Sequence, residues 1–497
     1  MFRIFLILIS FLISASGYSQ KKTKLEIINS ELTIYDASFN PDMRRLLDSV
    51  IFKHNSTTMF CDSAWHYFKE NKFEAFGNIH INKNDSLHLY GNHLDYIGKD
   101  DLAIISGNII IKDKTMTLRT DKVRYNLEKN VASYNNGATI INKENKLISE
   151  KGKYYSSLNK LEFKKDVELI NPDYIIKSDT LIFNTQSEIA YFFGPTDITS
   201  DSNFIYCENG WYNTKTDESR FSKNAYLENE DQKLFGDSLI YDRNLGYGLA
   251  LNNVSVEDTI NNFIIKGQKA ELFEKKDSSI ITIDPLLILL LEKDSLFLHS
   301  DTIVAKENKH SEKEIKASTG VKFYSEDIQG KCVELYYNHS DSTIKMIGSP
   351  TLWSDQYQMT ADSIDIQLKE KNIDKLLLND NSFIVSSPFP DLFDQIKGKS
   401  IIGYFKNNKI KNINVFGNGQ VTYTLQDDKE KVSGINTVKC SFMNIDVNKN
   451  RIKRISFQDK PESVIYPYSE LPLEWKKLNG FVWRENERVR SKMDIWE

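Results

Sequence analysis

Histidines are the first residues of this chain that could do chemistry. The sequence has eight of them, and His80, His88 and His93 lie close together. A zinc site needs ligands at compact spacings, such as those of paired cysteines and histidines. These three histidines lack that spacing and stand among polar residues of expected strands. We therefore predict no metal site and no bound cofactor.

Carboxylates offer the next possible chemistry. Asp121, Asp179 and Asp237 recur at intervals of 58 residues, which indicates a structural role. A glycosidase would instead need one pair of carboxylates whose pKa values are separated. The sequence also has no Gly-x-Ser-x-Gly, phosphate-binding loop, Cys-x-x-Cys or dinucleotide fingerprint. We predict that the protein is not an enzyme.

These aspartates belong to a repeat with a period of 29 residues. Its most regular members are the aromatic residues Tyr96, Tyr125, Tyr154, Phe183, Tyr212 and Tyr241. A second marker follows each aromatic residue, for example Gly107-Asn108, Gly137-Ala138 or Gly194-Pro195. A fixed period predicts one small unit stacked many times, in which each unit buries its apolar face against its neighbours. Function is then expected along a surface made by repetition.

Each repeat reads as two antiparallel strands joined by tight turns. In the strand through Asp121, Val123 and Tyr125 point to one side, whereas Lys122 and Arg124 point to the other. Glycine inside a strand marks a bend or a bulge. We therefore predict an all-β protein, an elongated jelly roll or solenoid of stacked V-shaped antiparallel strands with a 29-residue repeat. An apolar and aromatic lining is expected between its two sheets.

Composition limits the possible partners. The 64 basic and 69 acidic residues give a net charge of −5, which does not favour nucleic acid or a basic membrane-binding surface. Hydrophobic residues make up 40% of the chain, too many for a disordered protein. Tyrosine and phenylalanine are frequent and proline is rare, at 24, 28 and 10 residues, which is typical of strands.

The N-terminus resembles a targeting segment. Arg3 precedes an apolar run, Ile4–Ile13, and small residues that suit cleavage follow at 14–20. We expect a secretory signal peptide over residues 1–20 and no transmembrane segment after it, because no later apolar run is long enough.

The four cysteines are Cys61, Cys207, Cys332 and Cys440. Cys61 and Cys207 are 146 residues apart, which in this stack corresponds to about 50 Å. A disulfide needs Cα atoms within roughly 7 Å. We expect all four cysteines to be unpaired and buried.

The regularity of the repeat changes along the chain. We expect a lead-in over residues 21–44, regular repeats over 45–275 and less regular repeats over 276–460. Residues 461–497 break the pattern, with Pro461, Pro467 and Pro472 preceding three tryptophans. We expect this C-terminal tail to cover the last open sheet edge, since solenoids need protected ends.

The repeat resembles the OstA-like family, periplasmic proteins of lipopolysaccharide transport typified by LptA and the N-terminal domain of LptD. The resemblance rests on the pattern Asp-x-Leu-x-Tyr, as in Asp237–Tyr241, on the Ala-containing strand Leu102–Ile105 followed by Gly107-Asn108, and on Cys61–Ala64 with Phe73–Ile79. It covers roughly residues 45–460. This chain is far longer than the small bridge proteins of the family.

The resemblance implies a jelly roll that is open along one side and shields the acyl chains of lipid A. It implies a periplasmic location, either free or associated with the outer membrane, and lipopolysaccharide as a partner. Other transport proteins would pair along strand edges, copies could associate end to end, and no nucleic acid is expected. The candidate groove residues are Leu94, Tyr96, Ile109, Ile111, Val123, Tyr125, Tyr154, Val167, Leu169, Leu181, Phe183, Tyr212, Leu239 and Tyr241.

Two other functions stay open at this point. A β-solenoid carbohydrate-active enzyme would carry a charged cluster on one outer face. A non-catalytic envelope scaffold or adhesin would have a closed, dry core with no lipid bound. An inward aromatic residue such as Phe183 fits core packing as well as it fits a groove.

Overall fold

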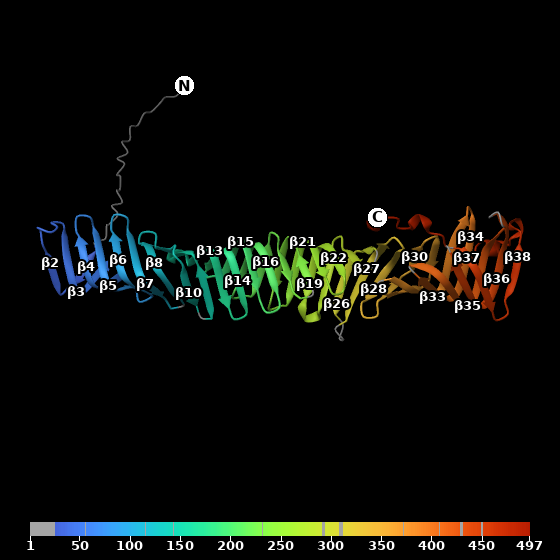
Figure 1. Cartoon of the computed structure of the whole chain (residues 1–497), viewed down its shortest axis with the longest axis horizontal. Helices are drawn as coiled ribbons and strands as arrows, with labels where there is room; N and C mark the ends of the chain where they lie inside the picture. The colour runs from blue at the N-terminus through green and yellow to red at the C-terminus, as the bar shows by residue number, and fades with distance from the viewer. Residues whose placement is uncertain are drawn as a thin grey trace, which may run out of the picture. The chain divides into compact units, whose positions relative to one another are not determined.

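The computed structural model describes residues 25–497 apart from 55, 115, 143, 231, 291–293, 308–311, 371, 407, 428–430 and 449–450. The expected signal peptide lies outside the described residues. The chain divides into two compact units, residues 1–172 and 173–497, and both consist almost entirely of antiparallel strands (Figure 1). No helix in the described part is long and apolar enough to cross a membrane. The expected all-β class is confirmed.

In unit 1 each long strand pairs with the next along the chain. The elements are β1 Glu26–Asn29, β2 Leu32–Tyr35, β3 Met43–His54, β4 Thr57–Tyr67, β5 Lys72–Lys83, β6 Leu87–Ile97, β7 Leu102–Lys112, β8 Thr117–Asn126, β9 Val131–Tyr134, β10 Ala138–Asn142, β11 Asn145–Ser149, β12 Lys151–Tyr155, the 3-10 turn η1 Ser156–Leu158, and β13 Lys160–Asn171.

A bulge bends the long strands near their middles. The pairing of β7 with β8 skips between Ser106 and Ile109, where Gly107 and Asn108 have φ angles of 85° and 50°. The pairing of β5 with β6 skips in the same way at Gly77 and Asn78. Two successive left-handed residues turn the strand sharply, and glycine and asparagine tolerate that conformation best. Each bent strand therefore contributes one half to each of two facing arms, as the glycines predicted.

The recurring acidic residues have a structural role at these bends. The amide of Asn78 donates to the Asp62 carboxylate on the preceding strand, with Nδ2–Oδ2 at 2.9 Å. Asn253 donates to Asp237 at the same distance of 2.9 Å. The acid on one strand thus holds the bulge of the next strand.

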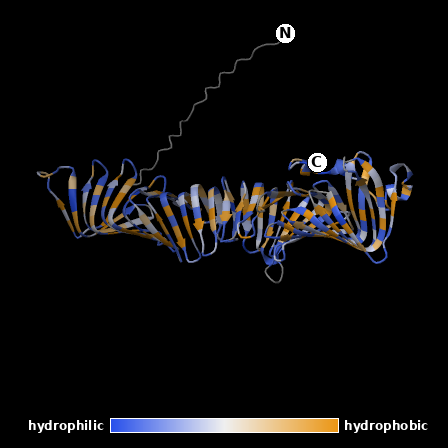
Figure 2. Cartoon of the chain, turned by 45° about the vertical axis from the view of Figure 1, so that its right-hand side comes forward, coloured by the Kyte–Doolittle hydropathy of each residue, from blue (hydrophilic) through white to orange (hydrophobic). Residues whose placement is uncertain are grey.

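Apolar side chains fill the space between the two arms. Phe52, Phe73 and Tyr96 stack across neighbouring strands of unit 1, with ring centroids 4.6 and 4.9 Å apart. Figure 2 shows hydrophobic and hydrophilic residues alternating along single strands. The alternation places one set in the interior and the other on the outer surface.

Unit 2 repeats this pattern with longer strands towards its end. Its strands are β14 Tyr174–Asn184, β15 Ile189–Thr199, β16 Phe204–Asn213, β17 Glu218–Ser222, β18 Tyr226–Glu228, β19 Gln232–Phe235, β20 Ser238–Asp242, β21 Tyr247–Asp258, β22 Phe263–Phe273, β23 Ser278–Thr282, β24 Leu286–Leu290, β25 Ser295–His299, β26 Thr302–Glu307, β27 Lys313–Tyr324, β28 Gln329–Asn338, β29 Thr343–Ile347, β30 Thr351–Ser354, β31 Tyr357–Thr360, β32 Ser363–Lys369, β33 Asn372–Phe389, β34 Leu392–Lys406, β35 Lys409–Gln426, β36 Val432–Asn448, β37 Arg451–Gln458 and β38 Glu462–Tyr466. Its short helical elements are η2 Glu274–Lys276, η3 Tyr468–Glu470, α1 Leu473–Lys476, η4 Glu485–Glu487 and η5 Asp494–Trp496.

The C-terminal tail, which we expected over residues 461–497 at the last sheet edge, begins there as the strand β38, which pairs with β36, and continues after β38 over neighbouring strands. It runs back across unit 2, and in Figure 1 the C-terminus lies near β27 and β30. Trp475 and Leu478 of the tail pack against Phe383 and Val385 of β33. At the far end, the Trp496 ring lies 4.1 Å from the His299 ring of β25, measured between centroids. The tail is therefore a strap over several strands.

Three glutamines hold this strap. Gln395 of β34 donates from Nε2 to the Lys476 carbonyl and accepts at Oε1 from the Leu478 N–H, both at 2.9 Å. Gln358 of β31 bonds in the same way to Val482 and Arg484, both at 2.6 Å. A side-chain amide can pair with a backbone donor and acceptor together, as another peptide group would.

The third glutamine, Gln329 of β28, accepts from the Arg488 guanidinium, with the closer nitrogen, Nη2, 2.7 Å from Oε1. The three glutamines belong to one row of paired residues across the sheet, with Trp353 and Val385 between them. Their strand neighbours Leu352 and Ile384 point into the core. The glutamine row therefore lies on the outer surface, beneath the strap.

We predict that Gln395→Ala loosens the strap. The substitution leaves the Lys476 carbonyl and the Leu478 N–H without partners, a loss of roughly 1–3 kcal/mol for each buried group. Amide hydrogen exchange over residues 471–484 should become faster. Gln367→Ala, at an exposed position of β32, is the matched control. Unchanged exchange in Gln395→Ala would show that the strap does not depend on this clamp.

The four cysteines are unpaired and buried, as expected. Burial raises the pKa of Cys61, Cys207 and Cys332 to about 12, and that of Cys440 in the same direction. Because the thiolate is the reactive form, these thiols should be inert in the folded protein.

We therefore predict no reaction of the native protein with a thiol-specific disulfide reagent at pH 8. Four thiols should react once denaturant unfolds the chain. Since the folded pKa lies above the unfolded value, the contribution of these groups to stability is present below pH 9 and is lost as the pH rises towards 12. Rapid labelling of a native thiol at pH 8 would contradict the assigned burial.

Candidate functional site

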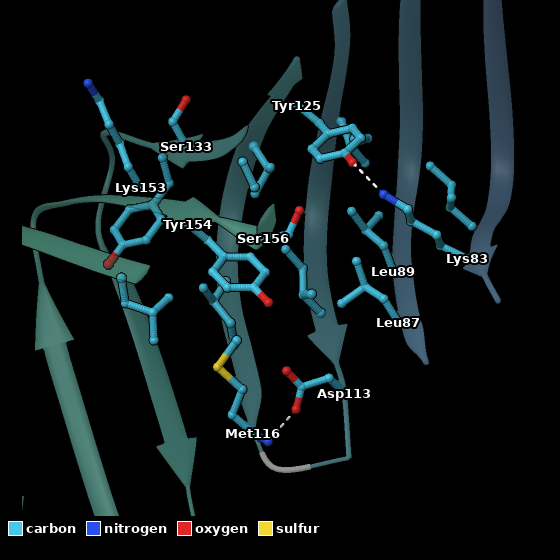
Figure 3. Close-up of a pocket in the computed structure, with 18 of the residues that line it drawn as sticks. Lys83, Leu87, Leu89, Asp113, Met116, Tyr125, Ser133, Lys153, Tyr154 and Ser156 are labelled. Carbon is cyan, nitrogen blue, oxygen red and sulfur yellow. Dashed lines mark hydrogen bonds between the residues drawn. The ribbon is translucent and has the colours of Figure 1, made fainter. Parts of the chain in front are cut away.

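An apolar cavity of about 570 Å³ lies between the two arms of unit 1. Its size is within the range of pockets that bind small molecules, roughly 300–1,000 Å³. Figure 3 shows the side chains that surround it. The apolar and aromatic lining residues are Ile81, Leu87, Leu89, Ala103, Ile105, Ile111, Met116, Leu118, Val123, Tyr125, Ala132, Tyr134, Ile140, Tyr154, Leu161 and Phe163.

Strand alternation places these side chains. Leu118 and Val123 of β8 point inward, whereas Arg119 and Arg124 beside them are exposed. Ile111 of β7 lies opposite Leu118, and Leu89 of β6 lies opposite Ile111. The lining is therefore a direct consequence of the two-residue period of the strands.

The strands that pass beside the cavity are interrupted. β8 pairs with β10 along one half and with β9 along the other, so β9 and β10 are two halves of one strand broken before Gly137. The Tyr134 ring occupies the space that a Cβ at Gly152 would need. The Tyr134 hydroxyl forms a buried hydrogen bond with Ser149 Oγ at 2.6 Å, and burial raises the pKa of Tyr134 to about 12. One wall of the cavity is thus a neutral phenol.

Polar groups surround the mouth of the cavity, where the tips of the two arms come together. The polar lining residues are Thr57, Lys83, Ser86, Asp113, Lys114, Ser133, Lys153 and Ser156. Asp113 accepts from the Met116 N–H at 2.8 Å, the lower dashed line in Figure 3. Lys83, at the tip of one arm, donates to the Tyr125 hydroxyl of the other arm at 3.1 Å. An apolar interior with a polar mouth suits an amphiphilic ligand.

Comparison with known proteins agrees with this architecture. Residues 22–179 and 177–237 match the sequence model of the OstA-like protein family. Residues 261–372 match that of the LptA/(LptD N-terminal domain) LPS transport proteins. OstA-like and LptA/LptD N-terminal domains thus extend across much of the chain. This OstA-like chain is thus a member of a group of lipopolysaccharide transport proteins, which are generally non-catalytic.

A solved structure also matches part of the OstA-like chain. It is LptH from Pseudomonas aeruginosa, described as the LptA homologous periplasmic component of the conserved lipopolysaccharide transport device. The match has 15% identity and a TM-score of 0.21, and covers 22% of this chain and 81% of LptH. No curated protein gives a match.

Four of the candidate groove residues of the OstA-like chain line the cavity, namely Ile111, Val123, Tyr125 and Tyr154. Leu94, Tyr96, Ile109 and Val167 are also buried between the arms but are not among the lining residues. Leu169 is half-buried at the far end of β13.

The other five candidates belong to unit 2. Leu181 and Leu239 are buried in its core, and Phe183 is half-buried. The Tyr212 hydroxyl donates to Asp217 at 2.6 Å and the Tyr241 hydroxyl to Glu274 at 2.7 Å. Burial followed by the hydrogen bond to Glu274 raises the pKa of Tyr241 to about 12. The cavity described in unit 2 is far smaller, about 20 Å³.

Most of the apolar lining residues were missing from the candidate set. They are Leu87, Leu89, Met116, Leu118, Ile81, Ala103, Ile105, Ala132, Tyr134, Ile140, Leu161 and Phe163. The first four flank the turns at the arm tips, where Leu87 and Leu89 alternate with His88 and Met116 and Leu118 alternate with Thr117. That alternation is the signal that could have identified them.

The three neighbouring histidines, His80, His88 and His93, lie on the outer surface of unit 1. His80 Nε2 and His88 Nδ1 are 3.2 Å apart. His93 lies with Glu74 and Asp95 in a half-buried group, but Glu74 is already paired with Lys72 at 2.6 Å. We assign no metal to this group.

The cavity predicts that two inward-facing alanines differ in how much stability is lost when each is replaced by leucine. Ala103 borders the cavity, whereas Ala75, an inward-facing residue of β5, is fully buried against its neighbours. Ala75→Leu should cost about 1–3 kcal/mol, as overpacking does, while Ala103→Leu should cost little because its side chain enters open space. Urea unfolding midpoints measure the difference. Equal losses would mean that the cavity is not open space.

Proposed function

We propose that this OstA-like chain binds lipopolysaccharide in the periplasm and holds acyl chains of lipid A in the cavity of unit 1. The observation that carries the proposal is the apolar interior beneath a polar mouth. The acyl chains would lie among Leu89, Leu118 and Val123, and the sugar head group would stay at the mouth. The signal peptide expected at residues 1–20 would direct the chain to that compartment.

Energetics support a ligand in this place. Exposing an acyl chain to water costs about 0.8 kcal/mol per methylene, so a lipid with several chains needs cover in an aqueous compartment. Covering apolar surface gains about 25 cal/mol per Å², so acyl chains that fill the open cavity of about 570 Å³ and cover its apolar lining would be stabilised there. A space of this size therefore supports room for a ligand.

We propose further that the inward candidate residues outside the cavity extend the lipid path within unit 1, and that those of unit 2, Leu181, Phe183, Tyr212, Leu239 and Tyr241, form a similar path within that unit. Neighbouring repeats offer similar linings, so a chain moving between them would meet similar free energies. Partners would add strands at free edges. β2 is such a segment, because Leu32, Ile34 and Tyr35 are all exposed and an exposed strand can pair with another chain. Another transport protein or a second copy could dock there.

Photo-crosslinking in cells tests the proposal. We place p-benzoylphenylalanine at position 125 or 154, which line the cavity, and irradiate. Lipopolysaccharide should attach at both positions. Position 124 is the outward control on the same strand. Position 94, which is buried outside the cavity, tests the extended path, and lipopolysaccharide should attach there as well if that path exists.

The pattern of attachment is decisive. Attachment at 125 and 154 but not at 124 places the lipid in the cavity. Silence at both cavity positions in a folded, exported protein would reject the proposed function and favour a scaffold with a sealed interior. Attachment at 124 alone would point to contact with the outer surface.

A further inference from the structure

Lys83 closes the mouth of the cavity in unit 1. It is the last residue of β5, at the tip of one arm. Its ammonium donates to the Tyr125 hydroxyl at 3.1 Å and to Asn130 Oδ1 at 3.1 Å, both on the other arm. Tyr125 also donates to Asn130 Oδ1 at 3.1 Å. Figure 3 shows the bond between Lys83 and Tyr125. These contacts join the arms directly over the apolar space.

The acceptors of Lys83 are both neutral. Among the described residues, no carboxylate lies within ion-pair distance of its ammonium, and the side chain is half-buried. Other lysines of the same unit are neutralised: Lys72 pairs with Glu74 and Lys160 with Glu162, both at 2.6 Å. Half-buried charges normally have a partner of opposite sign. Lys83 is thus a cation without a counter-ion at the entrance of an apolar cavity.

We propose that Lys83 is the receptor for an anionic head group, a phosphate carried by the amphiphile whose acyl chains occupy the cavity. This inference rests on the proposed function. Lysine binds phosphate as a compact positive charge, and hydrogen bonds between charged groups are about twice as strong as neutral ones. A phosphate therefore displaces Tyr125 and Asn130 as partners of the ammonium. Both can then donate to the phosphate themselves, through the hydroxyl and the amide.

The exchange makes Lys83 a latch as well as a receptor. Without ligand, its bonds hold the arm tips together across the mouth. When the head group arrives, the ammonium turns to the phosphate, and the direct bridge between the arms is replaced by one that runs through the phosphate. Lys114, exposed on the same rim, adds positive charge. Asp113 is the acidic residue among the lining residues, and its Oδ1 is bonded to the Met116 N–H.

The mouth of unit 2 is bridged differently. Lys313, at the start of β27, lies 2.7 Å from the Asp258 carboxylate at the end of β21, and Asp258 is 2% exposed. Asn408 donates to Asp327 at 2.7 Å. An anion arriving at Lys313 would leave a buried carboxylate without its partner, which is strongly unfavourable. By this criterion, Lys83 rather than Lys313 can receive a phosphate.

Binding of two probes to the full-length exported protein tests the assignment. Dodecyl phosphate and the uncharged dodecyl maltoside share one alkyl chain, and both are used below their micellar concentrations. The wild-type protein should bind dodecyl phosphate more tightly. Lys83→Gln should lower its affinity for dodecyl phosphate by roughly tenfold and leave dodecyl maltoside unchanged. Lys83→Arg should keep the preference.

Lys112→Gln is the matched control, because Lys112 is exposed at the end of the neighbouring strand β7 and does not line the cavity. It should bind both probes as the wild type does. Competition by inorganic phosphate tests whether the site takes a free anion or a lipid head group. Inorganic phosphate should not compete with dodecyl phosphate at equal concentration.

The outcomes distinguish the two proposals. If both probes bind and Lys83→Gln keeps the phosphate preference, Lys83 is not the receptor while the cavity still binds alkyl chains. If neither probe binds the wild-type protein, the proposed function itself fails. Effective competition by inorganic phosphate would overturn the assignment to a lipid head group.

Discussion

The bulge in the middle of the strands is the constraint on which the rest of the structure depends. At each bulge one or two residues take the left-handed conformation, as at Gly107 and Asn108, and the strand changes direction. A left-handed residue with a side chain costs about 1–2 kcal/mol, so the bends favour glycine, asparagine and aspartate. Without the bend, a stack of such strands would be one flat sheet with a single apolar face, and no interior would form.

The bend also explains why acidic residues recur along the repeat. The Asp62 and Asp237 carboxylates accept from the bulge asparagines of the following strands. The amide and the acid stabilise a conformation that the backbone alone disfavours. The same geometry fixes which residues face inward, because the alternation of side chains restarts on each side of the bulge. The bulge therefore determines both the bend of the strands and the residues that line the interior.

Much of this could be predicted from the sequence. Glycine within strands indicated the bends, and the alternation of Val123 with Arg124 indicated the inward face. Alternation gives the side on which a residue lies but not the distance between the arms. Ile109 and Ile111 have the same pattern in the sequence, yet Ile111 lines the cavity and Ile109 is buried outside it. The strand beside the cavity is interrupted before Gly137, and the effect of this interruption on strand pairing cannot be read from the local sequence.

The contacts least visible in the sequence join residues far apart in the chain. Lys83 meets Tyr125 three strands later, and Gln358 binds Arg484 in the tail. Neither contact leaves a periodic signal in the sequence, because the repeat pattern does not indicate which residues of distant segments will meet. The tail was expected at the sheet edge for this reason. Its prolines and tryptophans show that it departs from the repeat, but they do not specify the surface on which it packs.

The two units use one architecture with different interiors. In unit 1 the bridge across the mouth joins a cation to neutral oxygens, over a cavity of about 570 Å³. In unit 2 a bridge joins Lys313 to a buried carboxylate, Asp258, and the cavity described there is about 20 Å³. Separating a buried ion pair leaves two uncompensated charges, whereas releasing Lys83 leaves only groups that water or a ligand can satisfy. Opening at Lys83 therefore costs less than opening at Lys313, and of these two lysines Lys83 is the one that lies among the residues lining a cavity.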